Sequence, residues 1–392
     1  MRVVVPLVSA ASNISGVQRH AINLARALLR NPEITSLHLI AGPWQQYVLS
    51  ALPSDSRLYV EFPPVKNTVV GRNLWYATDL PLLCRELHAD VVHFAYPVPV
   101  RRSAFSAPLI VSLHDLYPHD LPENFGLLKA VFNRAILRQC LKAVDKIVCV
   151  SESTLERLDS LMPRLSLTSA IAIPNCVEPS EALPVRPSQL STTDRFLLCV
   201  GQHRRNKNLL LLLKAYCALL HSNALQENTR LVIVGIEGPE TSAIQHFIQE
   251  NALGQSVVLL KGLSEGELQW CYQHCNMLVA PSSVEGFGLP LAEGLMAGCR
   301  IVCSNIPSFR EIGGRHCRYV SLADDAVTCL ANAIAEQSAV AKPTPVTLSH
   351  FSIEAVGGKY AALYGALRST TPSASQPRVT SAHRHKRREL EV

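Results

Sequence analysis

Two glutamates, Glu285 and Glu293, flank a glycine-punctuated loop and the start of a predicted helix. Gly286 and Gly288 lie in that loop, and residues without a Cβ let a backbone approach a ligand closely. A helix that begins beside such a loop presents unpaired N–H groups, which bind anions and most often phosphate. Carboxylates beside these donors are suited to bind sugar hydroxyls. The stretch therefore predicts a site for a phosphorylated sugar. The alternative is a glycine-rich turn in which Glu293 only offsets the helix dipole.

Three cations stand in a second segment, directly after another apolar predicted strand. Arg204, Arg205 and Lys207 immediately precede a predicted helix. Arg and Lys side chains neutralise the charge that develops on phosphate groups during transfer reactions. Their place at the end of a strand predicts binding of a diphosphate leaving group, and the alternative is a solvated basic loop.

Two segments in the first half of the chain hold the remaining candidate site residues. His114 directly follows an apolar predicted strand, and near neutral pH its ring can donate or accept a hydrogen bond. Gly16 lies in a turn of small residues that enters a helix, where a phosphate or an acceptor can approach the backbone. The alternatives are a histidine anchored in its turn by Asp115 and an ordinary strand–helix turn. His119 and Asp120 are weaker candidates.

The segments are positioned by an alternation of predicted strands and helices. The strands are continuous apolar runs, which are typical of parallel sheets buried on both faces. They are predicted at 3–8, 37–41, 57–61, 90–94, 109–113, 146–150, 170–173, 196–200, 231–234, 257–260, 277–280 and 301–303. The clearest helices are predicted at 16–29, 208–221, 241–251, 265–274, 290–297, 323–336 and 352–367.

This alternation predicts an α/β fold with two Rossmann-like βαβ domains facing each other across a cleft. A chain of 392 residues has about the right length for two domains. Ligands of such sheets bind beyond the carboxyl ends of the strands, where all four candidate segments lie. The predicted parts are a first domain (1–176), a linker (177–194), a second domain (195–350), a C-terminal helix (351–368) and a disordered basic tail (369–392).

Composition narrows the class of protein. No run approaches the ~20 apolar residues of a membrane span. Twelve cysteines are scattered without a C-x-x-C pair, which favours the cytosol and argues against zinc at Cys271, His274 and Cys275. The last 24 residues hold five Lys or Arg against two Glu, which is half of the net charge of +6. The rest of the chain is therefore only mildly basic, and specific nucleic-acid binding is not predicted.

A basic stripe lies on an apolar helical stretch of the first domain. Its members are Lys129, Arg134, Arg138 and Lys142, and the last three recur every four residues. Such a stripe attracts anionic lipid by about 1 kcal/mol per cation. It predicts peripheral contact with a membrane and a lipid-linked acceptor, and the alternative is a solvated helix face. The basic tail adds to this contact, binds nucleic acid weakly or does neither.

Together, these segments resemble a family-4 retaining glycosyltransferase (glycosyl transferases group 1) of GT-B architecture. SSVEGFGLPLAEGLMAG resembles the Glu-x7-Glu signature of that family, and VGQHRRNKNLLLLLKAY resembles its phosphate-binding segment. VSLHDLYPHDLPENF resembles its histidine segment, and SGVQRHAINLARAL its first glycine turn. The resemblance covers residues 2–367, and the His-Asp form of the histidine segment is most similar to the mannosyltransferase branch.

The resemblance implies roles for the candidate residues. Glu285 would bind the hydroxyls of the donor sugar, Glu293 its ribose and Lys207 the diphosphate. His114 would lie at the reacting face of the sugar, and Gly16 would flank the phosphates. Glu285, His114 and Lys207 form the predicted catalytic set. The donor-binding set adds Gly16, Arg204, Arg205, Gly286, Phe287, Gly288, Leu289 and Glu293, with the loop amides contacting the sugar and the distal phosphate.

The resemblance also implies an activity. The family moves a hexose from a nucleotide-diphosphate sugar with retention of configuration and without a bound metal or other cofactor. GDP-mannose is the favoured donor, and a glycan or lipid-linked acceptor in cell-surface polysaccharide or lipopolysaccharide synthesis is expected. The expected location is the cytoplasm or the inner face of the membrane. Many relatives carry Arg or Thr where Gln202 stands and Arg where Asn206 stands, so either Arg204 or Arg205 is expected to partner Lys207.

Three other classes fit parts of the pattern. A sugar-nucleotide epimerase can share the architecture, but the Glu-x7-Glu pattern favours transfer. A non-catalytic sugar-nucleotide binding protein would keep donor affinity without turnover. A dinucleotide-dependent dehydrogenase needs G-x-G-x-x-G after a first strand, and neither half of the chain has it.

Overall fold

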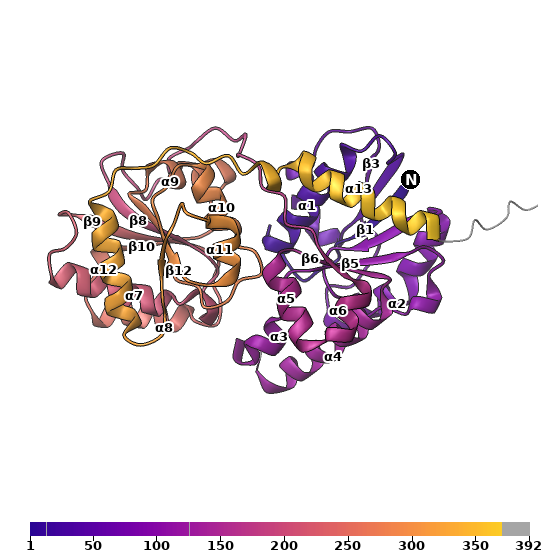
Figure 1. Cartoon of the computed structure of the whole chain (residues 1–392), viewed down its shortest axis with the longest axis horizontal. Coiled ribbons are helices and arrows are strands. Elements are labelled where there is room, and N and C mark those ends of the chain that lie inside the picture. Colours follow the sequence, from indigo (N-terminus) through magenta and orange to yellow (C-terminus); the bar gives the residue numbers. More distant parts are fainter. Residues whose placement is uncertain (13, 125, 371–392) are drawn as a thin grey trace, which may run out of the picture.

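Two parallel β-sheets organise residues 1–12, 14–124 and 126–370, which the computed structural model of this chain describes. Each sheet forms the centre of one lobe, with helices on both faces (Figure 1). The predicted α/β fold with two Rossmann-like domains is confirmed.

The first sheet has the strand order β3-β2-β1-β4-β5-β6-β7. Strands β4 and β5 are buried along their whole length because helices cover both faces, which explains their continuous apolar runs. The strands are β1 (Arg2–Pro6), β2 (Ser36–Ile40), β3 (Leu58–Glu61), β4 (Val91–Phe94), β5 (Leu109–Leu113), β6 (Lys146–Cys149) and β7 (Ala170–Ala172). The helices are α1 (Gly16–Leu29), α2 (Val69–Glu86), α3 (Tyr117–Asp120), α4 (Leu127–Ala143), α5 (Glu152–Leu161) and α6 (Pro163–Ser169).

The second sheet has the order β10-β9-β8-β11-β12-β13. It contains one strand more than the sequence predicts, because β13 is a short edge strand with one buried residue and gives no apolar run. The strands are β8 (Arg195–Val200), β9 (Thr229–Val234), β10 (Val257–Leu260), β11 (Met277–Ala280), β12 (Ile301–Ser304) and β13 (Arg318–Val320). The helices are α7 (Leu209–His221), α8 (Thr241–Glu250), α9 (Glu265–His274), α10 (Leu289–Met296), α11 (Pro307–Gly313) and α12 (Ala326–Ser338).

The last helix, α13 (Ile353–Thr370), returns to the first lobe and lies beside α1 (Figure 1). Val356, Tyr360 and Tyr364 are buried there in the same apolar core as β1. The chain therefore crosses between the lobes twice. The predicted basic tail lies outside the described residues from residue 371 onwards. Within the part that is described, no helix combines the length and the apolar character that a membrane crossing requires.

The strand orders place the cleft between the lobes. β1 lies between β2 and β4, and β8 lies between β9 and β11, so each strand order reverses beside the first strand of its sheet. Ligands of open α/β sheets bind beyond the carboxyl ends of the strands at this reversal. The segments 201–208 and 281–288 leave β8 and β11 at this point. The Gly286 carbonyl accepts hydrogen bonds from the Ser151 and Thr154 hydroxyls of the first lobe at 2.5 and 3.0 Å.

Candidate functional site

The loop 281–288 joins β11 to α10 and holds the glycines of the Glu-x7-Glu segment. Gly288 has a φ of 113°, a conformation that favours glycine, and it is the residue from which α10 begins. The Phe287 side chain is buried and packs edge-on against Phe351 with ring centroids 5.3 Å apart. This side chain anchors the loop, so Phe287 offers a ligand its backbone rather than its ring.

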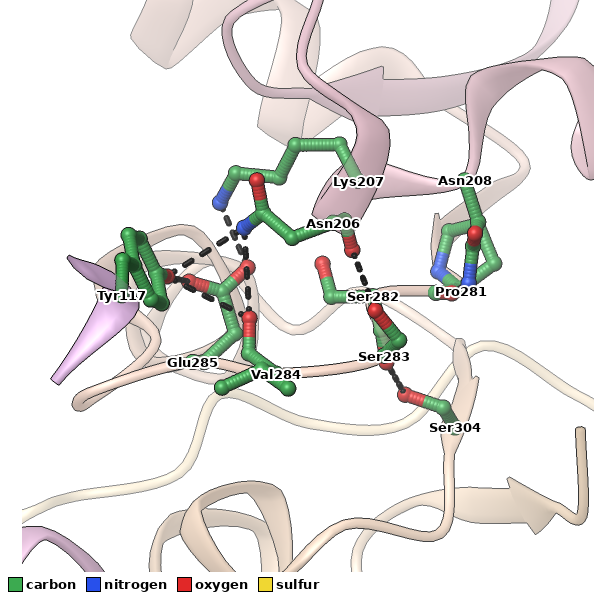
Figure 2. A network of polar contacts seen from close by, with 10 residues as sticks. All are labelled: Tyr117, Asn206, Lys207, Asn208, Pro281, Ser282, Ser283, Val284, Glu285 and Ser304. Atoms are coloured by element: carbon green, nitrogen blue, oxygen red, sulfur yellow. Dashed lines mark hydrogen bonds and ion pairs between the residues drawn. The ribbon is translucent and has the colours of Figure 1, made fainter. Parts of the chain in front are cut away.

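Glu285 lies in a polar network that joins the loop 281–288 to the 205–207 turn and to Tyr117 at the start of α3 (Figure 2). Lys207 Nζ is 2.5 Å from Glu285 Oε1, and the two side chains are only 18% and 10% exposed. The Tyr117 hydroxyl of the first lobe donates to Glu285 Oε2 over 3.4 Å. Asn206 Nδ2 lies 3.2 Å from both the Tyr117 hydroxyl and the Val284 carbonyl, which accepts its hydrogen bond. The fold thus brings the predicted carboxylate and lysine together at the point where the lobes meet.

The two candidate arginines differ in their surroundings. Arg205 is exposed at the start of a short 3₁₀ turn, Arg205–Lys207. Arg204 is half-buried, and its buried Nε has no hydrogen-bond partner among the described residues. The charge of Arg204 also acts on Asp115 and Tyr117, which belong to the first lobe. The fold therefore brings Arg204, rather than Arg205, to the cleft that Lys207 enters.

His114 lies on the first-lobe side of the cleft. Its Nε2 is 2.8 Å from the Ala95 carbonyl, which can only accept, so Nε2 carries the hydrogen and Nδ1 remains an acceptor. Burial lowers the pKa of His114, and the ring is neutral near pH 7. Asp115 accepts the Tyr117 N–H at 3.0 Å, so the Ala95 carbonyl rather than Asp115 holds the histidine ring.

The loop 281–288 contacts the His114 backbone directly. A Cβ added at Gly286 would lie 1.6 Å from the His114 carbonyl oxygen and 3.6 Å from Asp115 Cβ. Only glycine permits this approach, which places the loop 281–288 against the segment that carries His114.

Glu293 lies at another point of the same interface. The Tyr272 hydroxyl donates to Glu293 Oε2 at 2.8 Å, and burial raises the pKa of Glu293. Arg19 reaches from α1 to Glu265 Oε1 at 3.3 Å, and all four residues line one small pocket. Gly16 begins the helix that carries Arg19, and no atom lies within 4 Å of a Cβ added there.

Two larger pockets adjoin the Glu285–His114 region. One, of about 600 Å³, lies between the first lobe and the loop 281–288 and includes Glu285 and Gly286. The other, of about 400 Å³, lies between α2 and α4 and includes His114. Asp115 lines both pockets. The sequence does not indicate that Tyr117 and Asn206 belong to the polar network of Glu285, or that Asp115 lines both pockets. The signal available was position, because Asp115 and Tyr117 stand within three residues of His114.

The cysteine-rich segment around α9 forms no metal centre in the described residues. Cys271 and Cys275 are buried, and the His274 ring stacks on Trp270 with centroids 4.2 Å apart. Across residues 1–12, 14–124 and 126–370, no three His, Cys, Asp or Glu side chains gather in a group that could hold a metal ion.

Comparison with known proteins finds a glycosyltransferase family over each of the two lobes. Residues 14–181 match the family "Glycosyltransferase Family 4", and residues 185–336 match "Glycosyl transferases group 1". The chain is 26% identical over 331 residues to the O-antigen chain mannosyltransferase B of Escherichia coli, covering 77% of this chain and 81% of that protein. It is 24% identical over 258 residues to the O-antigen chain mannosyltransferase RfbU of Salmonella typhimurium, covering 64% and 67%.

A solved structure shows the same fold. The sucrose-phosphate synthase of Thermosynechococcus elongatus aligns over 94% of this chain and 99% of its own, with a TM-score of 0.68 and 17% identity. Two family matches cover the two lobes in order, and the lobes have the topology and the inter-lobe site described above. The chain therefore belongs to the glycosyltransferases of GT-B architecture, with a Family 4 domain followed by a group 1 domain.

Proposed function

We propose that this glycosyltransferase moves mannose from GDP-mannose to a lipid-linked glycan acceptor, with retention of configuration and without a bound metal. The observation that carries the proposal is the Lys207–Glu285 pair beside the Gly286 backbone where the lobes touch, with the charge of Arg204 acting on Asp115 of the first lobe. Mannose is supported by the two relatives, which are named O-antigen chain mannosyltransferases. The proposed role is in cell-surface polysaccharide synthesis at the cytoplasmic face of the membrane.

The proposed chemistry uses the charges of the second lobe. As the glycosidic C–O bond of the donor breaks, negative charge builds on the diphosphate. Lys207, Arg204 and the loop amides are donors aimed where that charge develops. A diphosphate competes with Glu285 for the Lys207 ammonium, which releases the carboxylate to bind sugar hydroxyls. His114 Nδ1 accepts a hydrogen bond from the sugar at the opposite wall.

Contacts between the lobes exclude water from the reacting atoms. Besides the bonds to the Gly286 carbonyl, Glu311 of α11 accepts the backbone N–H groups of Glu152 and Ser153 at 3.1 and 3.3 Å. These N–H groups open helix α5, where a carboxylate is favoured by the helix dipole. Closure of this kind limits hydrolysis of the donor.

The GDP-mannose assignment predicts a selective thermal shift. GDP-mannose at 100 times its dissociation constant should stabilise the protein by about 2.7 kcal/mol, whereas UDP- and dTDP-sugars at the same concentration should shift the melting temperature much less. Differential scanning fluorimetry measures this difference. Stabilisation by a UDP- or dTDP-sugar alone would show that the base assignment is wrong.

The proposed acceptor side lies in the first lobe. The helices α2 and α4, which wall the pocket of about 400 Å³, also carry large exposed apolar side chains. Val70 on α2 is 75% exposed and Leu128 on α4 is 87% exposed. Such side chains beside cations suit contact with an anionic lipid surface.

The basic stripe on α4 is only partly available for that contact. Lys129, Arg138 and Lys142 are exposed. Arg134 is half-buried, and its Nε donates to the Pro118 carbonyl at 2.5 Å, so this cation is partly used to hold α3 against α4. We propose that the three exposed cations and the apolar residues of α4 contact the membrane together.

Membrane contact through α4 predicts that the double variant Leu128→Ser, Phe132→Ser binds anionic vesicles at least 10-fold more weakly. Each apolar side chain that enters the lipid contributes about 1.5–3 kcal/mol when fully buried. Co-sedimentation with phosphatidylglycerol vesicles measures the loss. The control is Leu167→Ser, which changes a leucine that is 83% exposed on α6. The membrane contact would be contradicted if the double variant and Leu167→Ser bound the vesicles equally well. It would also be contradicted if wild-type binding did not weaken as the salt concentration rises.

A further inference from the structure

Asp115 lies at the junction of the two larger pockets. It follows His114 at the end of β5 and is half-buried. The residue borders the pocket beside Glu285 and also the pocket between α2 and α4. Asp115 Cβ is 3.6 Å from the position of a Cβ added at Gly286, so the residue adjoins the loop 281–288. A group that passes from the α2–α4 pocket to a sugar on that loop passes this carboxyl group.

No described residue forms an ion pair with the Asp115 carboxyl group, although the charge of Arg204 acts on it. Its Oδ1 accepts the Tyr117 N–H at 3.0 Å. Burial raises the pKa of Asp115 to about 6, and the negative charges of Glu285 and Asp120 act in the same direction. The Tyr117 N–H and the Arg204 charge oppose this change. A carboxyl group with a pKa near the working pH suits general base catalysis.

The other titratable groups around Asp115 are less suited to take a proton. Glu285 is paired with Lys207 and, in the proposed function, is released only to bind the hydroxyls of the donor sugar. Asp120 is paired with Arg157 at 2.6 Å. His114 donates its Nε2 hydrogen to Ala95 and faces the α2–α4 pocket together with Arg72.

On the other side, His119 and Glu156 border the pocket beside Glu285. Burial and the charges of Arg138 and Arg134 lower the pKa of His119, and Glu156 is exposed on α5. Asp115 is therefore the carboxylate that borders both pockets and is not held in an ion pair.

We propose that Asp115 accepts the proton of the acceptor hydroxyl during sugar transfer, and that the α2–α4 pocket holds the saccharide that carries this hydroxyl. This inference rests on the proposed function. In the step, the acceptor oxygen forms a bond to the anomeric carbon. The bond from that carbon to the diphosphate oxygen breaks, and its electron pair goes to the diphosphate. The proton of the acceptor hydroxyl goes to the Asp115 carboxylate.

The test compares pH–rate profiles of the wild type and Asp115→Asn. A base acts in its ionised form, so wild-type kcat/KM should rise with pH through about 6 and then level off. Asp115→Asn should lower transfer roughly 100- to 10,000-fold and remove this rise. Its affinity for GDP-mannose, measured by calorimetry, should stay within about twofold of the wild type, since the donor contacts remain.

Two further variants separate this role from a structural one. Formate supplies a small carboxylate, and it should restore part of the transfer by Asp115→Ala but not change the wild type. Asp79→Asn alters an exposed carboxylate of α2 and should keep the wild-type rate and pH profile. A folded Asp115→Asn with the wild-type rate and the same rise near pH 6 would overturn the proposal and assign the proton to the diphosphate. A wild type that transfers no sugar would instead refute the proposed function.

Discussion

Replacing Glu285 with Gln should lower sugar transfer roughly 100- to 1,000-fold, the size of effect seen when one transition-state hydrogen-bonding group is removed. The amide keeps the shape of the side chain but loses the negative charge that Lys207 contacts at 2.5 Å. It also offers the donor sugar one acceptor oxygen in place of two. Because both side chains are largely buried, the loss of the charge opposite Lys207 should also lower the free energy of unfolding by up to about 3–5 kcal/mol.

This prediction is measured as a transfer rate at saturating donor, together with the melting temperature. Glu250→Gln is the matched control, because Glu250 is an exposed carboxylate on α8 whose partner is His246 of the same helix. The control should turn over at the wild-type rate. A wild-type rate of transfer by Glu285→Gln would show that Glu285 does not bind the donor sugar.

Adding a single methyl group at Gly286 should lower turnover at least as severely. In Gly286→Ala the new Cβ would overlap the His114 carbonyl oxygen, which is 1.6 Å away and belongs to the backbone. Gly286 is not among the residues with positive φ, so alanine is allowed locally and the second lobe should still fold. The strain falls on the contact between the lobes. A misplacement of about 1 Å there is enough for a 100-fold loss in rate.

Small-angle scattering and transfer assays together test this variant. Gly286→Ala should show a larger radius of gyration than the wild type in the presence of donor, because the lobes cannot close. Gly254→Ala is the control, since no atom lies within 4 Å of its added Cβ. An unchanged radius and an unchanged rate in Gly286→Ala would contradict the closed arrangement of the site.

Most strands of the two sheets could be predicted because they are apolar runs of limited length. The edge strand β13 has one buried residue and no such run. The placement of α13 could not be predicted either, since its apolar residues fit either lobe and only the tertiary structure puts Tyr360 and Tyr364 beside β1.

The candidate site could be predicted in part, because Glu285, Lys207 and His114 each follow a strand and strand ends meet at one edge of a sheet. The sequence does not show whether Arg204 or Arg205 accompanies Lys207 in the cleft. The two residues are adjacent in one loop, and only the structure shows which of the two side chains is exposed. From the sequence alone, Asp115 fits the part of an anchor for His114. Its position between two pockets follows from helices α2 and α4, which are distant in the sequence.

The most direct measurement of the central proposal is proton NMR of the product formed from GDP-mannose and a membrane lipid extract as acceptor. We expect release of GDP in step with a new glycosidic signal of α configuration, the configuration of the donor, in the wild type and its loss in Glu285→Gln. Recovery of an epimerised nucleotide sugar would indicate an epimerase, and donor binding without any product would indicate a non-catalytic binding protein. Either result would contradict sugar transfer at this site.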